Sequence, residues 1–165
     1  MIILGIDPGT ATTGYGLIEA IGNNGKTKYK LLYYDCIVTS KEMEMPKRLL
    51  TIRKELKRLL MLHKPDVICI EQLFFGINSR TAMTVGQARG VVLVTAEEVG
   101  IPIFEYQGLQ VKKLITNDGR ADKKLVEKHV LKHLGKRKLD KPKNGFRDDA
   151  IDAIAIAISH NIFKS

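Results

Sequence analysis

The sequence predicts one α/β domain built on a mixed β-sheet, and three observations carry this prediction. The chain has 165 residues, about the length of one domain, and 44% of them are hydrophobic, enough to fill a core. Residues 1–40 hold three strand-like segments separated by turn residues, as in an antiparallel meander. After Pro65, short apolar segments alternate with helical patterns, which is typical of parallel strands. We therefore expect residues 1–165 to form a single domain.

The first strands are predicted at residues 2–7, 15–20 and 29–39, with a Gly-Asn-Asn-Gly turn at 22–25. Pro46 suits the first turn of a helix, and Pro65 ends it. Within that helix one apolar stripe is predicted, made by Leu49, Ile52, Leu56, Leu59 and Leu60.

The second half predicts strands at residues 67–70 and 103–106, the first an unbroken apolar run that suits burial on both faces. Helices are expected near residues 79–99, 109–115, 121–134 and 149–162. The last helix should have one apolar face, formed by Ile151, Ile154, Ala155, Ile158 and Ile162.

Positive charge dominates the chain, with 27 Lys and Arg against 18 Asp and Glu, a net charge of +9. Such a charge favours polyanionic partners. Residues 136–147 hold six bases and one acid with a Pro and a Gly, which predicts a mobile basic loop. A solvated segment is the plain alternative. Because the loop leads into the acids of the last helix, we interpret Lys141, Lys143 and Arg147 as DNA-binding residues.

No apolar run is long enough to span a membrane, and the first residues lack the features of a signal peptide, so we expect a cytoplasmic protein without a membrane partner. Cys36 and Cys69 lie in apolar segments without the spacing of a metal site. We expect both to be reduced core residues.

Four carboxylates lie where a fold does not favour unpaired acids, and they are the candidate catalytic residues. Asp7 and Glu71 each end an apolar strand, and Asp149 and Asp152 share one face of the last helix. Gathered acids repel one another unless a cation neutralises them, and oxygen ligands alone suit Mg²⁺ or Mn²⁺. Two such ions can drive phosphodiester hydrolysis. A helix cap at Asp149 and a surface acid at Asp152 are the plain alternatives, and Asp148 is equally well spaced from Asp152.

Four motifs resemble the RuvC family of bacterial Holliday-junction resolvases, in order and over nearly the whole chain: GIDPGT with GYG at residues 5–16, IEQ at 70–72, GQARG at 86–90 and DAIDAIAIA at 149–157. The resemblance implies an RNase H-like fold with a five-stranded mixed sheet flanked by helices. It further implies a magnesium-dependent endonuclease that cuts four-way junction DNA symmetrically, leaving a 5′-phosphate and a 3′-hydroxyl. Its catalytic and metal-binding acids would be Asp7, Glu71, Asp149 and Asp152.

The same resemblance implies that Lys112 and Lys123 hold phosphates and that Phe74 stacks on a base, although surface and core roles remain open for them. It implies a homodimer, with RuvA and RuvB as partners and with two Mg²⁺ ions per site that Mn²⁺ can replace. The helix with Gly86, Ala88 and Gly90 suits either the dimer contact or packing against the sheet.

Two departures from the family are visible: the chain stops soon after the last helix, and Asp148 doubles the acid at Asp149. Three other functions remain open. The DPGT motif also resembles a sugar-kinase phosphate loop, the opening motif suits an RNA-directed nuclease of the YqgF type, and the basic charge suits a non-catalytic junction-binding module.

Overall fold

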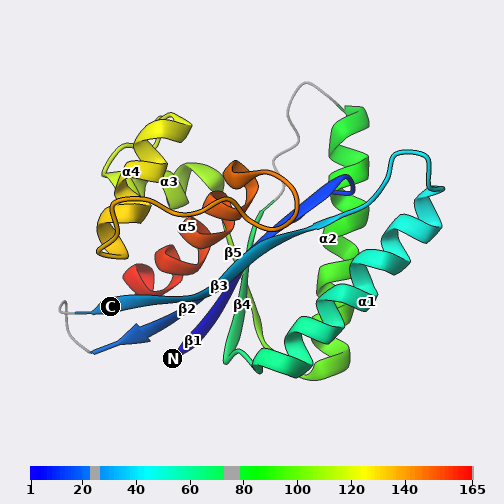
Figure 1. The fold of residues 1–165 in the computed structure, drawn as a ribbon, viewed down its shortest axis with the longest axis horizontal. Coiled ribbons are helices and arrows are strands. Elements are labelled where there is room, and N and C mark those ends of the chain that lie inside the picture. Colours follow the sequence, from blue (N-terminus) through cyan, green and yellow to red (C-terminus); the bar gives the residue numbers. More distant parts are fainter. Residues whose placement is uncertain (23–26, 73–78, 165) are drawn as a thin grey trace.

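The computed structural model describes residues 1–22, 27–72 and 79–164, with no side chains described for 79–81. Its sheet has five strands in the order β3-β2-β1-β4-β5 (Figure 1). They are β1 (Ile2–Asp7), β2 (Thr12–Ile21), β3 (Lys28–Val38), β4 (Val67–Glu71) and β5 (Ile103–Tyr106). The first three strands are antiparallel, whereas β4 lies parallel to both β1 and β5. The predicted mixed sheet is confirmed.

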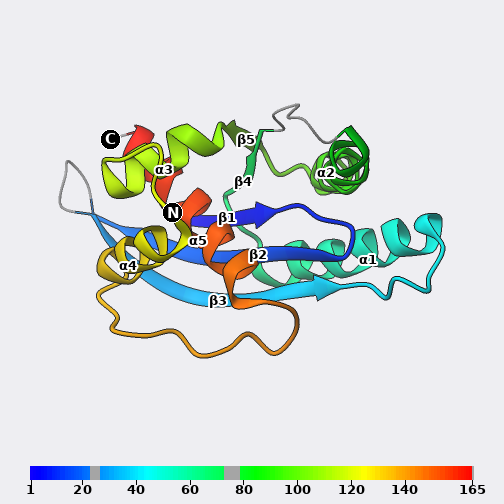
Figure 2. The same ribbon diagram turned by 90° about the horizontal axis from the view of Figure 1, so that it is seen from above.

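Two layers of helices cover the sheet (Figure 2). One layer holds α1 (Met45–His63) and α2 (Ser79–Val99). The other holds α3 (Gly108–Thr116), α4 (Lys123–His133) and α5 (Arg147–Lys164). Each layer closes its own apolar core against one face of the sheet. In α1 the predicted stripe is confirmed, because Ile52, Leu56, Leu59 and Leu60 are buried.

The structure corrects the prediction for the last helix. We expected one apolar face, but every residue of α5 from Ala153 to His160 is buried. The helix lies between the sheet and the α3–α4 pair, so all of its sides meet protein. Glycines on the strands permit this close approach, since a Cβ at Gly5 would overlap the backbone of Ala153 and one at Gly14 the backbone of Asp149.

The basic segment, which we define as residues 135–146, is an exposed loop with specific contacts to the rest of the fold. Most of its residues are exposed, as its charge predicted. Leu139 is buried, the Tyr34 hydroxyl donates to the carbonyl oxygen of Asp140 (2.9 Å), and Asp35 accepts from the backbone N–H of Asn144 (2.7 Å). The segment is therefore held to β3 at Asp140 and Asn144, which its charge count did not predict.

Both cysteines are buried and unbridged, as predicted. Among the described residues, no helix has the length and apolar content that crossing a bilayer would need.

Candidate active site

Strand ends bring Asp7 and Glu71 to one edge of the sheet. Strands β1 and β4 are parallel neighbours, and Ile6 pairs with Ile70 one residue before each acid. Parallel strands end at the same edge, so the two carboxylates emerge side by side. Both residues are partly buried. The strand register that buries the preceding isoleucines therefore also fixes the spacing of these acids.

The start of α5 supplies the other acids. Gly14 pairs with Asp7 in the sheet, and the backbone carbonyl of Asp149 lies against Gly14. Asp149 and Asp152 are partly buried, whereas the Asp148 side chain is 59% exposed and lies 3.5 Å from the Lys123 Nζ. The charge of Asp149 contributes to the raised pKa of Asp7, whereas the Asp148 side chain is mostly exposed beside Lys123. This difference favours Asp149 over Asp148 as the inward acid.

Burial raises the pKa of all four acids, and repulsion among acids adds to this effect. Burial, followed by the charges of Asp152, Glu71 and Asp149, raises the pKa of Asp7 from 3.8 to about 7. Burial and the charge of Asp152 raise the pKa of Glu71. The pKa values of Asp149 and Asp152 are also raised, chiefly by burial, with Lys123 acting against the rise in both. The four acids that the sequence singled out therefore share one electrostatic environment.

Two lysines border the acids, at the positions predicted. Lys112 and Lys123 line a hollow of about 230 Å³ together with Glu71 and Asp152. Lys123 Nζ lies 3.9 Å from an Asp152 carboxylate oxygen. Burial alone would lower the pKa of Lys123, but the charges of Asp152, Asp148 and Asp149 together raise it. Lys123 thus partly compensates the excess negative charge.

The residues fit a hard divalent cation. Asp7, Glu71, Asp149 and Asp152 offer oxygen atoms only, and hard cations prefer such donors. Their raised pKa values mark negative charge that a cation would neutralise. Within the described part of the chain, no three His, Cys, Asp or Glu residues are close enough to form a finished metal centre.

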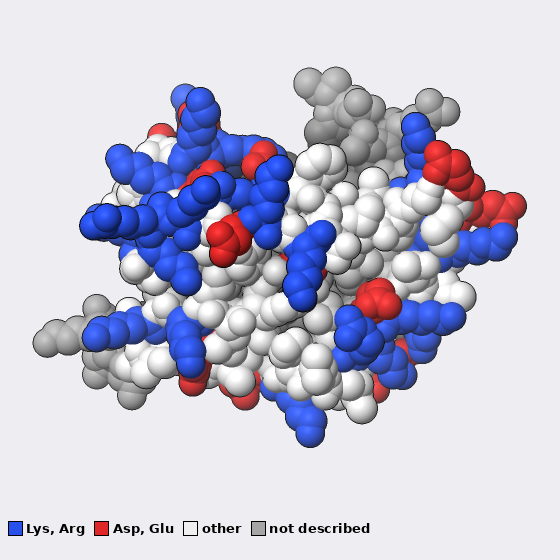
Figure 3. Space-filling model, viewed as in Figure 1, with Lys and Arg blue, Asp and Glu red and all other residues white. Residues whose placement is uncertain are grey.

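The remaining predicted residues differ in their surroundings. Lys141 and Lys143 line a groove between β3 and the basic segment. Arg147 forms an ion pair with Glu127 of α4, which holds its guanidinium between two helices. Phe74 lies outside the described residues. Figure 3 shows Lys and Arg gathered over the side of the molecule that holds α4 and the basic segment, with a few acidic side chains among them.

Two functional residues escaped the sequence analysis. Gly108, the first residue of α3, lies against the Glu71 carboxylate, which a Cβ at this position would displace. A glycine two residues after a strand was the available signal. Asp35 is 3% exposed in β3 and holds the basic segment. An acid within a strand-like run could have drawn notice, but its partner Asn144 is 109 residues away.

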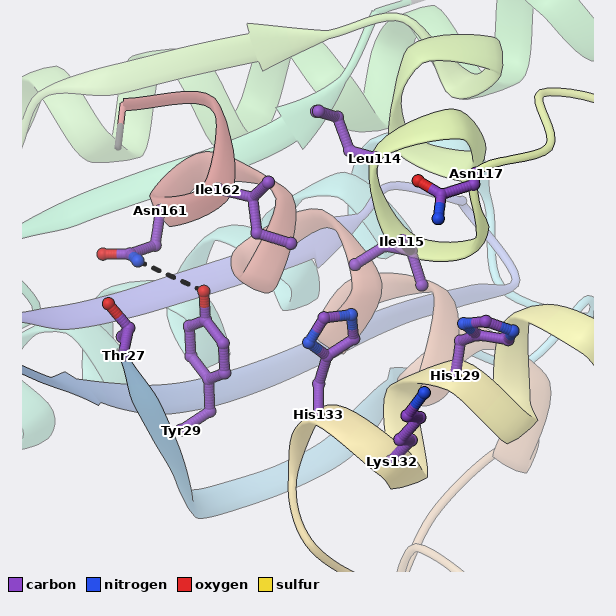
Figure 4. Close-up of a pocket in the computed structure, with 10 residues that line it drawn as sticks. All are labelled: Thr27, Tyr29, Leu114, Ile115, Asn117, His129, Lys132, His133, Asn161 and Ile162. Atoms are coloured by element: carbon purple, nitrogen blue, oxygen red, sulfur yellow. Dashed lines mark hydrogen bonds between the residues drawn. The ribbon is translucent and has the colours of Figure 1, made fainter. Parts of the chain in front are cut away.

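A larger hollow, of about 580 Å³, lies elsewhere (Figure 4). It is lined from β3, α3, α4 and α5, with His129, Lys132 and His133 on one side and Tyr29 and Asn161 on the other. No carboxylate lines it, so it lacks the ligands that Mg²⁺ prefers. Lys132 lies in the last turn of α4, where a cation stabilises the helix end, whereas burial lowers the pKa of the neighbouring His133.

The sheet order and the acids at the ends of its parallel strands define an RNase H-like nuclease. The family model described as "Crossover junction endodeoxyribonuclease RuvC" matches residues 3–160. The chain belongs to the RuvC family.

Individual relatives support the same family assignment. The chain is 49% identical over 160 residues to crossover junction endodeoxyribonuclease RuvC of Syntrophomonas wolfei, covering 97% of this chain and 88% of the relative. It is 45% identical over 165 residues to the protein of the same name from Caldicellulosiruptor saccharolyticus, covering 100% and 95%. The solved structure of Thermus thermophilus RuvC matches with a TM-score of 0.87 at 32% identity, covering 99% and 95%. The T. thermophilus RuvC complex with a Holliday junction substrate gives 0.85 at 29% identity, with the same coverage.

Proposed function

We propose that this chain resolves Holliday junctions by metal-dependent hydrolysis at Asp7, Glu71, Asp149 and Asp152. As a member of the RuvC family, the chain is a crossover junction endodeoxyribonuclease, and divalent metal dependence is general in that family. The single observation that supports the residue assignment is the shared electrostatic environment of the four acids, centred on Asp7. The family match favours this function over the kinase-like, RNA-directed and non-catalytic alternatives.

We assign Mg²⁺ as the ion, with two per site and Mn²⁺ as a substitute. When bound, the ions would activate a water and stabilise the leaving oxygen of the cut strand. Asp7 and Glu71 hold the site from the sheet, while Asp149 and Asp152 hold it from α5. Lys112 and Lys123 attract the phosphate that flanks the cut, because both border the hollow beside Glu71 and Asp152. The products would be a 5′-phosphate and a 3′-hydroxyl.

We further propose that residues 1–165 are one nuclease domain that acts as a homodimer, since two symmetric cuts need two sites. The outer face of α2 supports a dimer contact there. Met83 and Val94 are 70% and 58% exposed, and a Cβ at Gly90 would meet nothing within 4 Å, while Ala88 packs inward. A cytoplasmic location and the partners RuvA and RuvB are proposals that rest on the sequence and the family resemblance. Phe74 and Arg147 are kept as proposed DNA contacts.

The test is cleavage of a labelled mobile four-way junction, beside matched duplex and RNA–DNA hybrid, in Mg²⁺ and in EDTA. We expect symmetric nicks near the crossover in Mg²⁺ only, and none with Asp7→Asn. Glu44→Gln, which removes an exposed acid just before α1, is the matched control and should cut normally. Junction binding by the wild type without cutting in Mg²⁺ or Mn²⁺ would contradict the proposal.

A further inference from the structure

The basic segment and β3 together form a groove. Strand β3 is an outer strand of the sheet, and the segment runs beside it (Figure 2). The groove between them has a volume of about 280 Å³. Four lysines of the segment line it: Lys136, Lys138, Lys141 and Lys143. The β3 side contributes Tyr34, whose hydroxyl donates to the Asp140 carbonyl oxygen, whereas the ring of Tyr33 stacks on Tyr15 and His63.

Asp35 is the buried anchor of this arrangement. It is 3% exposed, and its carboxylate accepts three hydrogen bonds: from the Asn144 backbone N–H (2.7 Å), the Asn144 side-chain amide (3.1 Å) and the Cys36 backbone N–H (2.9 Å). Within the described part of the chain, no Lys or Arg forms an ion pair with Asp35. A buried carboxylate is costly unless donors satisfy it, and two of its three donors belong to the basic segment.

The anchored end of the segment adjoins the acids. In the sheet, Cys36 pairs with Gly14, and Gly14 pairs with Asp7. The Cys36 Sγ lies 3.4 Å from the Phe146 carbonyl oxygen, and a Cβ at Gly145 would overlap the Cys36 side chain. Gly145 has a φ of +70°, which glycine adopts readily. The segment therefore continues directly into the first turn of α5, which holds Asp149.

We propose that Asp35 is a positioning residue that docks the basic segment against β3, so that Lys136, Lys138, Lys141 and Lys143 form a track for the phosphate backbone of a junction arm. The track leads to the acids at the start of α5. This proposal rests on the proposed function, because it assigns the substrate arm that enters the same site. The occupant is a DNA backbone, since the groove presents four lysines against one acid, Asp140.

The proposal is testable because it predicts the opposite change in DNA affinity from that expected of net charge alone. Removing an acid from a basic surface should strengthen DNA binding if only net charge matters. If Asp35 docks the segment, Asp35→Asn should instead weaken DNA binding. The new side-chain amide points an N–H donor toward the Asn144 amide, and this contact weakens the anchor. Asp140→Asn is the matched control: it removes the same charge from the same segment, at an exposed carboxylate, while its carbonyl still accepts from Tyr34.

The experiment measures binding of a labelled four-way junction in EDTA, by fluorescence anisotropy, over a range of salt concentrations. We expect Asp35→Asn to weaken binding about tenfold at 0.1 M salt. The negative slope of log K against log salt should also become shallower, by about 0.9 for each phosphate that the displaced lysines no longer neutralise. Asp140→Asn should bind as tightly as the wild type or tighter. A variant that merely lowers the folded fraction would keep the wild-type slope.

Asn144→Ala and Tyr34→Phe are milder second variants, each removing one anchoring hydrogen bond, and they carry the test if Asp35→Asn does not fold. Both variants should make the salt slope of junction binding shallower, as expected for Asp35→Asn. Lys141→Gln should lower the slope in the wild type but not in Asp35→Asn, where the lysine is already displaced. A folded Asp35→Asn protein that binds as tightly as Asp140→Asn, with an unchanged slope, would overturn the proposal. Wild-type cleavage in Mg²⁺ tests the proposed function separately, since the binding assay contains no metal.

Discussion

Replacing Asp7 with Asn should stabilise the metal-free protein at neutral and alkaline pH. Burial and the charges of Asp152, Glu71 and Asp149 raise the pKa of Asp7 from 3.8 to about 7. In the unfolded chain Asp7 loses its proton near pH 4, whereas in the folded protein it keeps the proton until about pH 7. Between these values the folded state binds more protons, so the stability of the wild type falls as pH rises and levels off above pH 7.

The rise in the pKa of Asp7 corresponds to a cost of about 4 kcal/mol in the free energy of unfolding above pH 7. Asp7→Asn removes this cost, which already includes the repulsion between Asp7 and the neighbouring acids. At pH 8 in EDTA the variant should therefore be the more stable protein, by up to about 4 kcal/mol. Below pH 4 the difference should vanish, because Asp7 is then protonated in both states.

Urea unfolding in EDTA at a series of pH values from 4 to 8 checks this prediction. Adding Mg²⁺ at pH 8 should stabilise the wild type and close the gap, since the variant lacks one ligand of the proposed site. Glu44→Gln is the control, because Glu44 is exposed and forms only a surface ion pair with Lys47. A wild type and an Asp7→Asn variant with parallel pH curves would refute the reasoning.

Three other predictions follow from the site. Asp149→Asn should abolish junction cutting, while Asp148→Asn should keep most of it, as single-turnover cleavage in Mg²⁺ would measure; equal losses would contradict the inward placement of Asp149. Gly14→Ala should lower the melting temperature by several degrees and cut poorly, because the added methyl group overlaps the start of α5; a wild-type melting temperature would contradict this. Replacing Lys141 and Lys143 by Gln should reduce the salt slope of junction binding by about 2, and an unchanged slope would return both lysines to a solvated role.

Much of the fold could be predicted from the sequence because its signals are local. The strand at residues 103–106 and the helix at 79–99 match the structure, since alternating apolar patterns and flanking Gly and Pro residues determine them. The four acids could be singled out for the same reason: each follows an apolar run or opens a helix. The resemblance to the RuvC family added the junction substrate, which no local pattern contains.

The sequence could not reveal what depends on distant contacts. The basic segment was predicted to be a mobile loop from its own charge. Its hydrogen bonds to Asp35 have no local signal, because Asp35 lies more than 100 residues before Asn144. The last helix looked one-sided because periodicity does not show how many layers surround a helix. Likewise, the choice between Asp148 and Asp149 depends on which side chain is buried near Asp7, and both positions suit one helix face with Asp152, at spacings of four and three residues.

The acids and the basic segment have opposite effects on a phosphate backbone, and the fold separates them while keeping them adjacent. Glycine at position 14 allows α5 to bring Asp149 against the sheet, where the acids repel one another and destabilise the metal-free protein. On β3, one position away from the residue that pairs with Gly14, Asp35 is satisfied by hydrogen bonds and secures the lysines instead. Two carboxylates of the same sheet thus have different roles because one faces other acids and the other faces N–H donors. The destabilisation caused by neighbouring acids is confined to a place where a bound cation can offset it. The lysines that attract DNA are held on β3, where they do not neutralise those acids.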